Sequence, residues 1–313
     1  MPRFASRLAG ALLCAAASLA QAVDMSPVQV APHTWYVLGK AGMASTANEG
    51  FMSNAGFVIT DEGVVVLDAL GTPPLGEQLI AEIAKLTDKP IRRVIVSHYH
   101  ADHYYGLQAF KERGIEIWAH KAGEAILGSE EAQARLEQRR ADLFPFVDEK
   151  TVPIPADRWL DDDGAEFRLG GISFRVIFVG PTHSPDDVVL QVVEDEVVFA
   201  GDLLFRGRVP FVGNANTKRW LEALDRLIEI DAKILVPGHG PVSKDPQADL
   251  VMTRDYLRFL RQELGRAVEE MKSFEEAYAD IDWSAWEKLP AFREANRLNA
   301  YNVFIQMEQS SLR

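Results

Sequence analysis

Cysteine is almost absent from this chain of 313 residues, in which Cys14 carries the one thiol. Cys14 lies in an N-terminal stretch that we expect to be removed, so the mature protein would hold no cysteine. This excludes disulfide bonds as a source of stability, and it excludes a metal site with thiolate ligands. A chain of this length buries enough apolar surface to fold without such bonds.

Positive charge is also scarce, because 33 Lys and Arg residues stand against 46 Asp and Glu, for a net charge of -13. Nucleic acid is bound through a basic surface, so we expect no nucleic-acid partner. Beyond the N-terminal stretch no apolar run is long enough to cross a bilayer, and we expect no membrane span. The expected partner is a small-molecule substrate, and bound metal ions can supply positive charge toward an anionic one.

The N-terminus has the three parts of a secretory signal. Arg3 and Arg7 give a positive start, residues 8–19 are apolar and small, and residues 20–22 read Ala-Gln-Ala, a small-residue cleavage site. The apolar run is too short for a spanning helix. The sequence therefore predicts a signal peptide over residues 1–22 and a periplasmic location.

Strands and helices alternate through the rest of the chain. Runs of β-branched and aromatic residues between turn residues predict strands at 34–40, 54–60, 64–69, 93–97, 115–119, 165–169, 172–179, 187–193, 196–200 and 233–236. Helical periodicity predicts helices at 73–87, 107–113, 122–143 and 217–230, with two or three more in 246–308. This order is that of an α/β four-layer αβ/βα sandwich, which we place at residues 23–245, with a C-terminal helical extension at 246–313.

The strongest motif is His98-Tyr99-His100-Ala101-Asp102-His103, which directly follows the predicted strand 93–97. The protein has only seven histidines, and three of them stand in this block, which argues against chance. Imidazole and carboxylate groups suit zinc, and the set is too rich in nitrogen for Ca²⁺ or Mg²⁺. A turn after a rigid strand lets these side chains converge on one point.

Three more ligand-competent residues stand just after predicted strands, namely His183, Asp202 and His239. Since every candidate follows a strand, all can gather on one rim of stacked sheets. Core histidines or helix caps would not show this regularity. We therefore expect one metal site built from the six-residue block and these three residues.

The block 98–103 resembles the H-x-H-x-D-H signature of the metallo-β-lactamase superfamily, and the later residues match its later His, bridging Asp and final His in order. The likeness covers roughly residues 34–242 and implies the metallo-β-lactamase sandwich with two Zn²⁺ per chain. By this resemblance the first zinc is bound by His98, His100 and His183, the second by Asp102, His103 and His239, and Asp202 bridges both.

Two of these residues restrict the resemblance to one part of the superfamily. In the first lactamase subclass a Cys corresponds to Asp202, and His103 has no ligand counterpart, so the ligand set is similar instead to glyoxalase II, the lactonases and related hydrolases. The segments 181–187 and 201–205, together with the predicted signal peptide, are most similar to the exported quinoprotein-relay zinc metallohydrolases. This implies a link to a periplasmic quinoprotein oxidation system.

The resemblance implies a zinc-dependent hydrolase in which a metal-bridging hydroxide cleaves a small acyl bond, a thioester or related ester. Asp102 would orient the nucleophile as well as bind metal. No G-x-S-x-G elbow or mature cysteine offers a competing nucleophile. The alternatives are β-lactam hydrolysis, phosphodiester cleavage, and a low-turnover accessory protein of a quinone-linked oxidation system.

Several residues near the ligand motifs admit two interpretations. Substrate contact and packing beneath the metal loop are both open for Tyr99, Tyr104 and Tyr105. An oxyanion donor and a turn residue are both open for Asn214 and Asn216. Contact with a substrate carboxylate and, as the commoner case, simple surface exposure are open for Arg206 and Arg208. A structural or surface role is the interpretation for His33 and His120.

Overall fold

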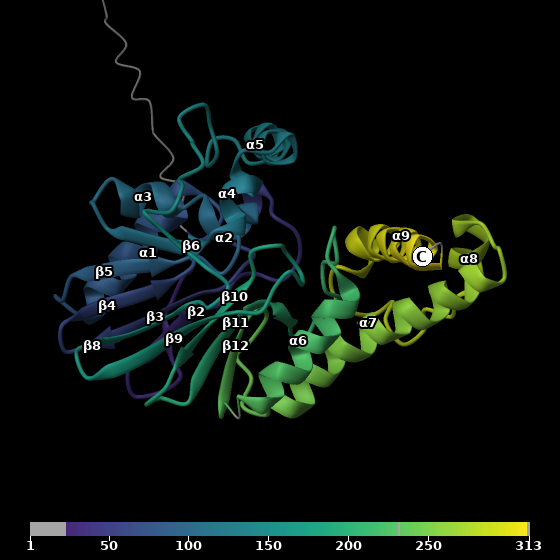
Figure 1. The fold of residues 1–313 in the computed structure, drawn as a ribbon. Coiled ribbons are helices and arrows are strands. Elements are labelled where there is room, and N and C mark those ends of the chain that lie inside the picture. The colour runs from purple at the N-terminus through teal and green to yellow at the C-terminus, as the bar shows by residue number, and fades with distance from the viewer. Residues whose placement is uncertain (1–22, 231, 312–313) are drawn as a thin grey trace, which may run out of the picture.

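The computed structural model describes residues 23–230 and 232–311. Two β-sheets pack face to face, and helices cover the outer face of each sheet (Figure 1). The predicted signal peptide, residues 1–22, lies outside the described residues.

The first sheet has seven strands in sequence order, β1 (Val28–Gln29), β2 (Thr34–Val37), β3 (Ala55–Thr60), β4 (Gly63–Leu67), β5 (Ile91–Ile95), β6 (Glu116–His120) and β7 (Arg158–Leu160). The strands from β1 to β4 are antiparallel, and those from β4 to β7 are parallel. Thr60 pairs with Gly63, so β3 and β4 form a hairpin closed by a tight turn.

The second sheet has the order β12-β11-β10-β9-β8. Its strands are β8 (Ala165–Leu169), β9 (Ile172–Phe178), β10 (Val188–Val192), β11 (Val197–Phe205) and β12 (Ile234–His239). Every pair is antiparallel except β11 with β12, which is parallel. The ends of β11 and β12 therefore lie side by side.

The helices fall into two groups (Figure 1). On the side of the first sheet lie α1 (Pro73–Leu86), α2 (Ala101–Tyr104), α3 (Leu107–Lys111), α4 (Ala122–Leu127) and α5 (Glu130–Asp142), with a short 3-10 turn, η1 (Thr46–Asn48). On the other side lie α6 (Thr217–Glu229), α7 (Pro246–Glu269), α8 (Phe274–Asp280) and α9 (Phe292–Ser311). The long helix α7 extends away from the sandwich, and α8 and α9 lie along its far part.

Three buried apolar layers hold the four structural layers together. Leu79 and Phe110 pack between the first sheet and its helices. Phe174 and Phe199 pack between the two sheets. Trp220 packs between the second sheet and helices α6, α7 and α9. Each such side chain contributes about 1.5–3 kcal/mol by leaving water. The predicted four-layer αβ/βα architecture and the C-terminal helices are confirmed.

Several predicted boundaries were wrong. The strands predicted at 196–200 and 233–236 continue to Phe205 and His239. The helix predicted at 122–143 is two helices, because Gly128 caps the end of the first and Ser129 caps the start of the second by accepting a hydrogen bond from its backbone. The short strands β1 and β7 were missed, since two or three residues show no periodic pattern.

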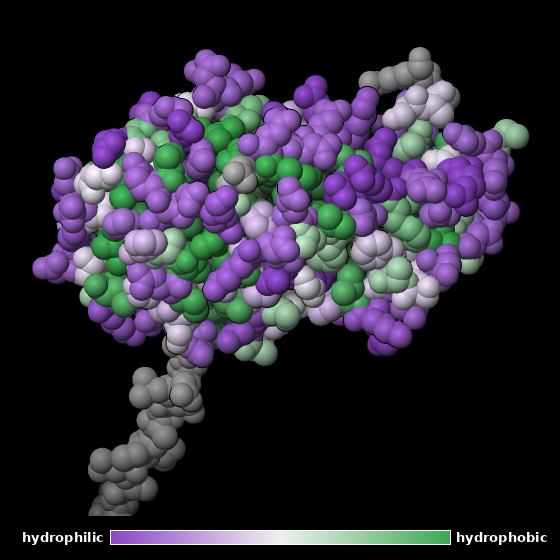
Figure 2. Space-filling model, turned by 90° about the horizontal axis from the view of Figure 1, so that it is seen from below, coloured by the Kyte–Doolittle hydropathy of each residue, from purple (hydrophilic) through white to green (hydrophobic). Residues whose placement is uncertain are grey.

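No helix among the described residues is long and apolar enough to cross a membrane. The face of the molecule seen from below is covered mostly by hydrophilic side chains, with hydrophobic ones scattered between them (Figure 2).

Candidate metal centre

All seven predicted ligand residues come together at the rim of the two sheets. The segment that joins β5 to α2 carries His98 and His100, and the single turn of α2 carries Asp102 and His103. His183 lies between β9 and β10. The ligand-competent atoms form two groups, each with its atoms within 4.8 Å of one another: His98, His100, His183 and Asp202, and then Asp102, His103 and His239.

The first group has the spacing of a metal site. The Nδ1 atom of His100 lies 3.1 Å from Nε2 of His98 and 2.9 Å from Nε2 of His183. The Oδ2 atom of Asp202 lies 3.3 Å from Nε2 of His183. Tetrahedral zinc with ligand bonds of about 2.0–2.1 Å leaves its ligand atoms roughly 3.4 Å apart. Three nitrogens and a carboxylate oxygen therefore surround a space of the right size.

The second group has similar spacing and shares Asp202 with the first. The Oδ2 atom of Asp102 lies 3.3 Å from Nε2 of His239 and 3.6 Å from Nε2 of His103. Asp202 reaches the same two histidines, at 3.4 Å from His239 and 3.3 Å from His103. Asp202 thus stands between the two groups, as a bridging ligand must.

Hydrogen bonds fix the tautomers of His98 and His103. The Ser97 hydroxyl donates to Asp68 over 2.8 Å, so its oxygen can only accept from Nδ1 of His98, 3.0 Å away. Asp68 also accepts from Nδ1 of His103 over 2.9 Å. In both rings the proton is held at Nδ1, and in the neutral ring the lone pair of Nε2 faces the centre. Carboxylate partners of this kind orient metal-binding histidines and raise their basicity.

His239 is oriented in the same way by a backbone carbonyl. Its Nδ1 donates to the oxygen of Met52 over 2.8 Å, and a carbonyl can only accept. The Nε2 of the neutral ring therefore directs a lone pair toward the carboxylates of Asp102 and Asp202. A stacked Phe205 ring, 5.1 Å away and tilted by 8°, supports the imidazole.

The histidines of the first group are held neutral by burial. Burial lowers the pKa of His183 to about 3. It also holds the pKa of His98 well below its ordinary value, and His103 and His100 lower it further. Neutral imidazole is the form that binds metal, so this group is prepared to accept an ion.

In the second group, carboxylates outweigh burial in setting the pKa of the histidines. Burial lowers the pKa of His103, but Asp202 and Asp102 outweigh it and raise that pKa well above its ordinary value. The pKa of His239 is raised for the same reason. Burial raises the pKa of Asp202, but His239 and His103 hold it well below its ordinary value.

Two polar atoms at the centre have no hydrogen-bond partner among the described residues. Nε2 of His103 and Oδ1 of Asp202 are buried and accept or donate no hydrogen bond within the described part of the chain. A buried polar atom without a partner costs about 1–3 kcal/mol. A divalent cation between the lone pairs and the carboxylates would satisfy both atoms, so the residues present fit a two-metal centre.

Asp202 and His239 are not placed just past their strands, as the sequence predicted, but within them. β11 shifts register around Gly201, which has a φ of +52°, and this distortion turns Asp202 toward the rim. A Cβ on Gly238 would lie 1.9 Å from Oδ1 of Asp202. Glycine at 238 is therefore required for the carboxylate to pass β12.

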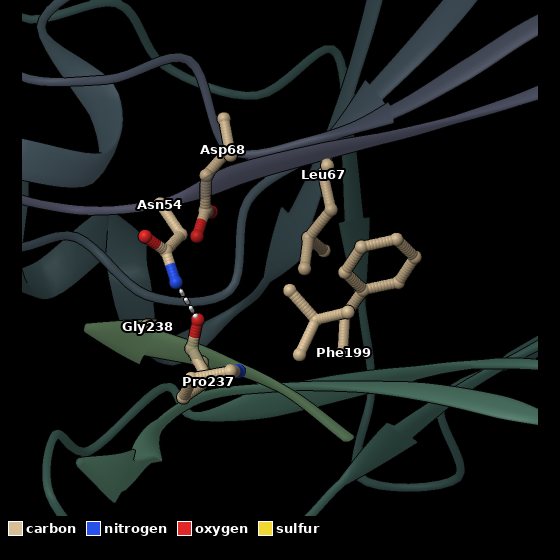
Figure 3. A pocket seen from close by; sticks show the side chains of 10 residues that line it. Asn54, Leu67, Asp68, Phe199, Pro237 and Gly238 are labelled. Atoms are coloured by element: carbon tan, nitrogen blue, oxygen red, sulfur yellow. Dashed lines mark hydrogen bonds between the residues drawn. The ribbon is translucent and has the colours of Figure 1, made fainter. Parts of the chain in front are cut away.

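Below the centre, Asn54 joins the two sheets. Its Nδ2 donates to the oxygen of Pro237 over 2.7 Å and to that of Gly240 over 2.8 Å. Figure 3 shows the bond to Pro237 and places Asn54 and Asp68 across a small cavity of about 10 Å³ from Pro237 and Gly238. The space is that of about one water molecule. Asn54 thus fixes the strand that ends in His239.

Asp186 joins the two histidine-bearing loops. It accepts from the backbone nitrogen of Tyr99 over 2.9 Å and from the hydroxyl of Ser184 over 2.5 Å. Tyr99 lies between His98 and His100, and Ser184 follows His183. Burial raises the pKa of Asp186 to about 6. Sequence reasoning missed Asp68 and Asp186 as supports, although each is an acid next to an apolar strand.

The structure decides between the paired interpretations of the tyrosines and asparagines. Tyr99, Tyr104 and Tyr105 are buried and pack against one another, which confirms the packing interpretation. Asn216 caps α6 by accepting from the backbone of Arg219. Asn214 donates to Glu131 of α5 over 3.3 Å. These bonds give both asparagines a structural role, and the oxyanion role stays a prediction.

The structure also tests the interpretations of the two remaining histidines and of the two arginines. His33 pairs with Asp195 over 2.8 Å, and His120 stacks on a Phe178 ring 3.8 Å away, which confirms their structural role. Arg206 pairs with Asp249 of α7. Arg208, in contrast, is 3 % exposed, so the interpretation of a surface arginine is wrong for it.

The loop at 206–216, between β11 and α6, borders the first group. The ring of Phe211 lies 6.5 Å from that of His100 and 6.4 Å from that of His183. One face of α9 holds this loop: Asn299 accepts from the backbone of Val212 and donates to the oxygen of Pro210. The C-terminal helices therefore help to position the wall of the metal centre.

A two-sheet sandwich with paired His and Asp groups at its rim defines a class of metal-dependent hydrolases, and the comparisons agree. The model of the metallo-beta-lactamase superfamily matches residues 48–239, more than half of the chain. The chain belongs to this superfamily.

Relatives of several kinds share this domain. A linear primary-alkylsulfatase of Pseudomonas sp. is 26% identical over 247 residues, covering 66% of this chain and 45% of that protein. The hydroxyacylglutathione hydrolase GloC of Haemophilus influenzae is 27% identical over 196 residues, covering 61% of this chain and 86% of that protein. This chain thus spans less than half the length of the alkylsulfatase.

Solved structures agree on the fold. The metallo-beta-lactamase from Pontibacter korlensis superposes with a TM-score of 0.57 at 22% identity, over 75% of this chain and 99% of that one. The C-terminal helices account for much of the part of this chain that exceeds the domain matched by the superfamily model.

Proposed function

We propose that this protein is a periplasmic di-zinc hydrolase that cleaves a small acyl bond, a thioester or related ester. The observation that carries the proposal is the sharing of Asp202 by two groups of ligands whose histidine tautomers are fixed from outside. The similarity to a hydroxyacylglutathione hydrolase supports an acyl substrate. The predicted signal peptide supports the location, and the link to a quinoprotein oxidation system stays a prediction.

The ligands are divided between the two ions as the distances suggest. His98, His100 and His183 would hold one zinc, and Asp102, His103 and His239 the other, with Asp202 between them. Bound zinc would supply hydroxide at neutral pH and an electrophile for the oxygen on which charge develops. A closed structural zinc site has four protein ligands, whereas seven ligands for two ions leave positions open.

Asp102 is the residue that we assign to the reacting water. Its side chain is 14% exposed, while that of Asp202 is 4% and that of His103 is 0% exposed. Asp102 therefore reaches the open side of the centre. There its carboxylate can accept a proton from the nucleophilic water and hold that water in line with the carbonyl carbon. Asp202 is enclosed, so we assign it to metal binding only.

Two measurements test the proposal. Metal analysis of the purified protein should give about two zinc ions per chain, and less than one would contradict the two-metal assignment. A panel of thioesters, lactones, nitrocefin-type lactams and phosphodiesters should show turnover of the acyl compounds. Asp102→Ala should lower kcat by at least about 100-fold, the range of a lost general base, and equal activity in this variant would refute the role of Asp102.

A further inference from the structure

Glu49 is a buried acid without a cation. The residue is 8 % exposed, and among the described residues no Lys, Arg or His pairs with its side chain. Burial raises the pKa of the Glu49 carboxyl, and only the backbone of Val23, which donates a hydrogen bond to it, lowers that pKa. Glutamate is almost never buried to this degree unless it is paired.

The backbone at Glu49 also sets this residue apart. Its φ is 56°, in the left-handed region that residues with a side chain rarely adopt. Glycine takes this conformation without a steric cost, and Gly50 does so at the next position. An acid in place of glycine at such a position indicates that the carboxyl itself has a role.

Val23 is held next to Glu49 by its own contacts. Gln78 of α1 donates from Nε2 to the backbone oxygen of Val23 over 2.7 Å. The side chain of Val23 packs against the core between the first sheet and its helices, and Met25, 2 % exposed, belongs to the same core. The contacts of residues 23–25 therefore hold the nitrogen of Val23 beside the Glu49 carboxyl.

Val23 is also the residue that follows the predicted signal-peptide cleavage site at 20–22. Cleavage there converts the amide nitrogen of Val23 into an ammonium group, with a positive charge and three donors. A buried carboxylate is costly when it is unpaired and is stabilised by an opposite charge in contact with it. The processed chain thus supplies the cation that Glu49 lacks.

Glu49 lies in the segment that supports the second ligand group. In this segment the backbone oxygen of Met52 accepts from Nδ1 of His239 over 2.8 Å. The hydroxyl of Ser53 donates to the backbone oxygen of Asp102. An anchor at Glu49 therefore restrains the two residues that position His239 and Asp102.

We propose that Glu49 is the binding site for the α-ammonium group of Val23, which cleavage after Ala22 releases, and that this ion pair fixes the segment 49–53 behind the second ligand group. The ion pair forms in the processed chain alone, so removal of the signal peptide raises both the stability of the fold and the affinity for the second zinc ion. The pair is independent of the substrate and thus goes beyond the proposed function.

The test compares two N-termini in a double-mutant cycle. One chain begins at Val23, the other keeps residues 20–22 and so has an uncharged amide at Val23, and each is made with Glu49 and with Glu49→Gln. Urea unfolding at pH 7 with a chelator measures stability. In the chain that begins at Val23, Glu49→Gln should lower the folding equilibrium constant about 10- to 100-fold, the effect of a lost hydrogen bond between charged groups.

In the chain that keeps residues 20–22, Glu49→Gln should leave the folding equilibrium constant unchanged or raise it, because Gln buries no charge. An equal loss in both chains would overturn the ion pair. Asp24→Asn is the matched control, since Asp24 is an exposed acid beside the same amine. It should act equally in both chains, and an effect confined to the chain that begins at Val23 and as large as that of Glu49→Gln would overturn a specific role of Glu49.

Competition with a chromophoric chelator tests the effect on the metal centre. The chain that begins at Val23 should bind the second zinc ion about 3- to 30-fold more tightly than the chain that keeps residues 20–22, the usual range of coupling between distant sites. Glu49→Gln should remove this difference. Equal affinities of the two chains would overturn the effect on the centre.

N-terminal sequencing of the exported protein tests the premise. The protein recovered after export with its own N-terminus should begin at Val23, and a different first residue would overturn the ion pair. None of these measurements uses turnover, so a failure of the ion pair and a failure of the proposed acyl hydrolysis are distinguishable.

Discussion

Asp68 and His103 face each other over 2.9 Å in the buried floor of the metal centre, and the same carboxylate accepts from the hydroxyl of Ser97. Ser97 in turn accepts from His98. One acid therefore sets the tautomer of a histidine in each ligand group. Neither histidine can present its lone pair reliably if this acid is lost.

Asp68→Asn should consequently weaken metal binding by about 10- to 100-fold, the usual effect of removing such a support. Asn tolerates the positive φ of 61° at this position, so the backbone should remain as it is. Competition with a chromophoric chelator measures the affinity. Asp163→Asn, at an exposed site, is the control, and equal affinities in the two variants would contradict the assignment.

Gly238→Ala should abolish binding of at least one metal ion. The new Cβ would stand 1.9 Å from Oδ1 of Asp202, so either the carboxylate or β12 must move. Metal content after dialysis should fall from about two to one or fewer per chain. At Gly128 a Cβ meets nothing closer than 3.7 Å, so Gly128→Ala should keep full metal content.

Acid should remove the second metal ion before the first. Protons compete with metal for His103 and His239, because Asp202 and Asp102 raise the pKa of both rings against the effect of burial. Burial instead lowers the pKa of His183 to about 3, so the first group gains no proton until the pH is far lower. Metal content measured after dialysis at decreasing pH should pass through a plateau near one ion per chain. Simultaneous loss of both ions would contradict this order.

Asp186 should make the metal-free protein less stable as the pH rises. Its pKa is about 6 in the folded protein, against an ordinary value of 3.8, so the folded state binds the proton more tightly. The free energy of unfolding should then fall by up to about 3 kcal/mol between pH 4 and 6 and stay low above that range. Asp186→Asn should lack this fall. Urea unfolding of both proteins in the presence of a chelator measures the difference, and parallel curves would rule the effect out.

Asn299→Leu should damage the centre from a distance. The change leaves the backbone groups of Val212 and Pro210 without their partner, at about 1–3 kcal/mol for each buried group. The loop that carries Phe211 should then loosen, and KM should rise together with the loss of stability. Leu298→Ala, an exposed neighbour on the same helix, should change neither KM nor the unfolding midpoint by a comparable amount.

The layers of the fold and the seven ligand residues could be predicted because their signals are local. A run such as Val64 to Leu67 has the composition of a buried strand wherever it lies, and the block 98–103 places several ligands within one turn. The path of β11 could not be predicted. Gly201 has no side chain to pack, and the register shift that turns Asp202 inward depends on the neighbouring strands.

The burial of Arg208 could not be predicted for a related reason. Nothing in the local sequence distinguishes it from Arg206, two positions earlier. The difference arises because Arg206 meets Asp249 of α7, while Arg208 lies over the ring of Phe205, which stacks on His239. Burial of a long cationic side chain is decided by tertiary packing and not by propensity.

Each ligand group takes residues from both sheets. His100 and His183 meet at 2.9 Å although they are 83 positions apart in the sequence, and His239 meets Asp102 at 3.3 Å. An ion in either group therefore acts as a reversible cross-link between the two halves of the chain, in a protein whose predicted mature form has no disulfide to do this. The strength of that cross-link depends on the free metal concentration, so the folding equilibrium of the protein should follow the zinc supply of its compartment.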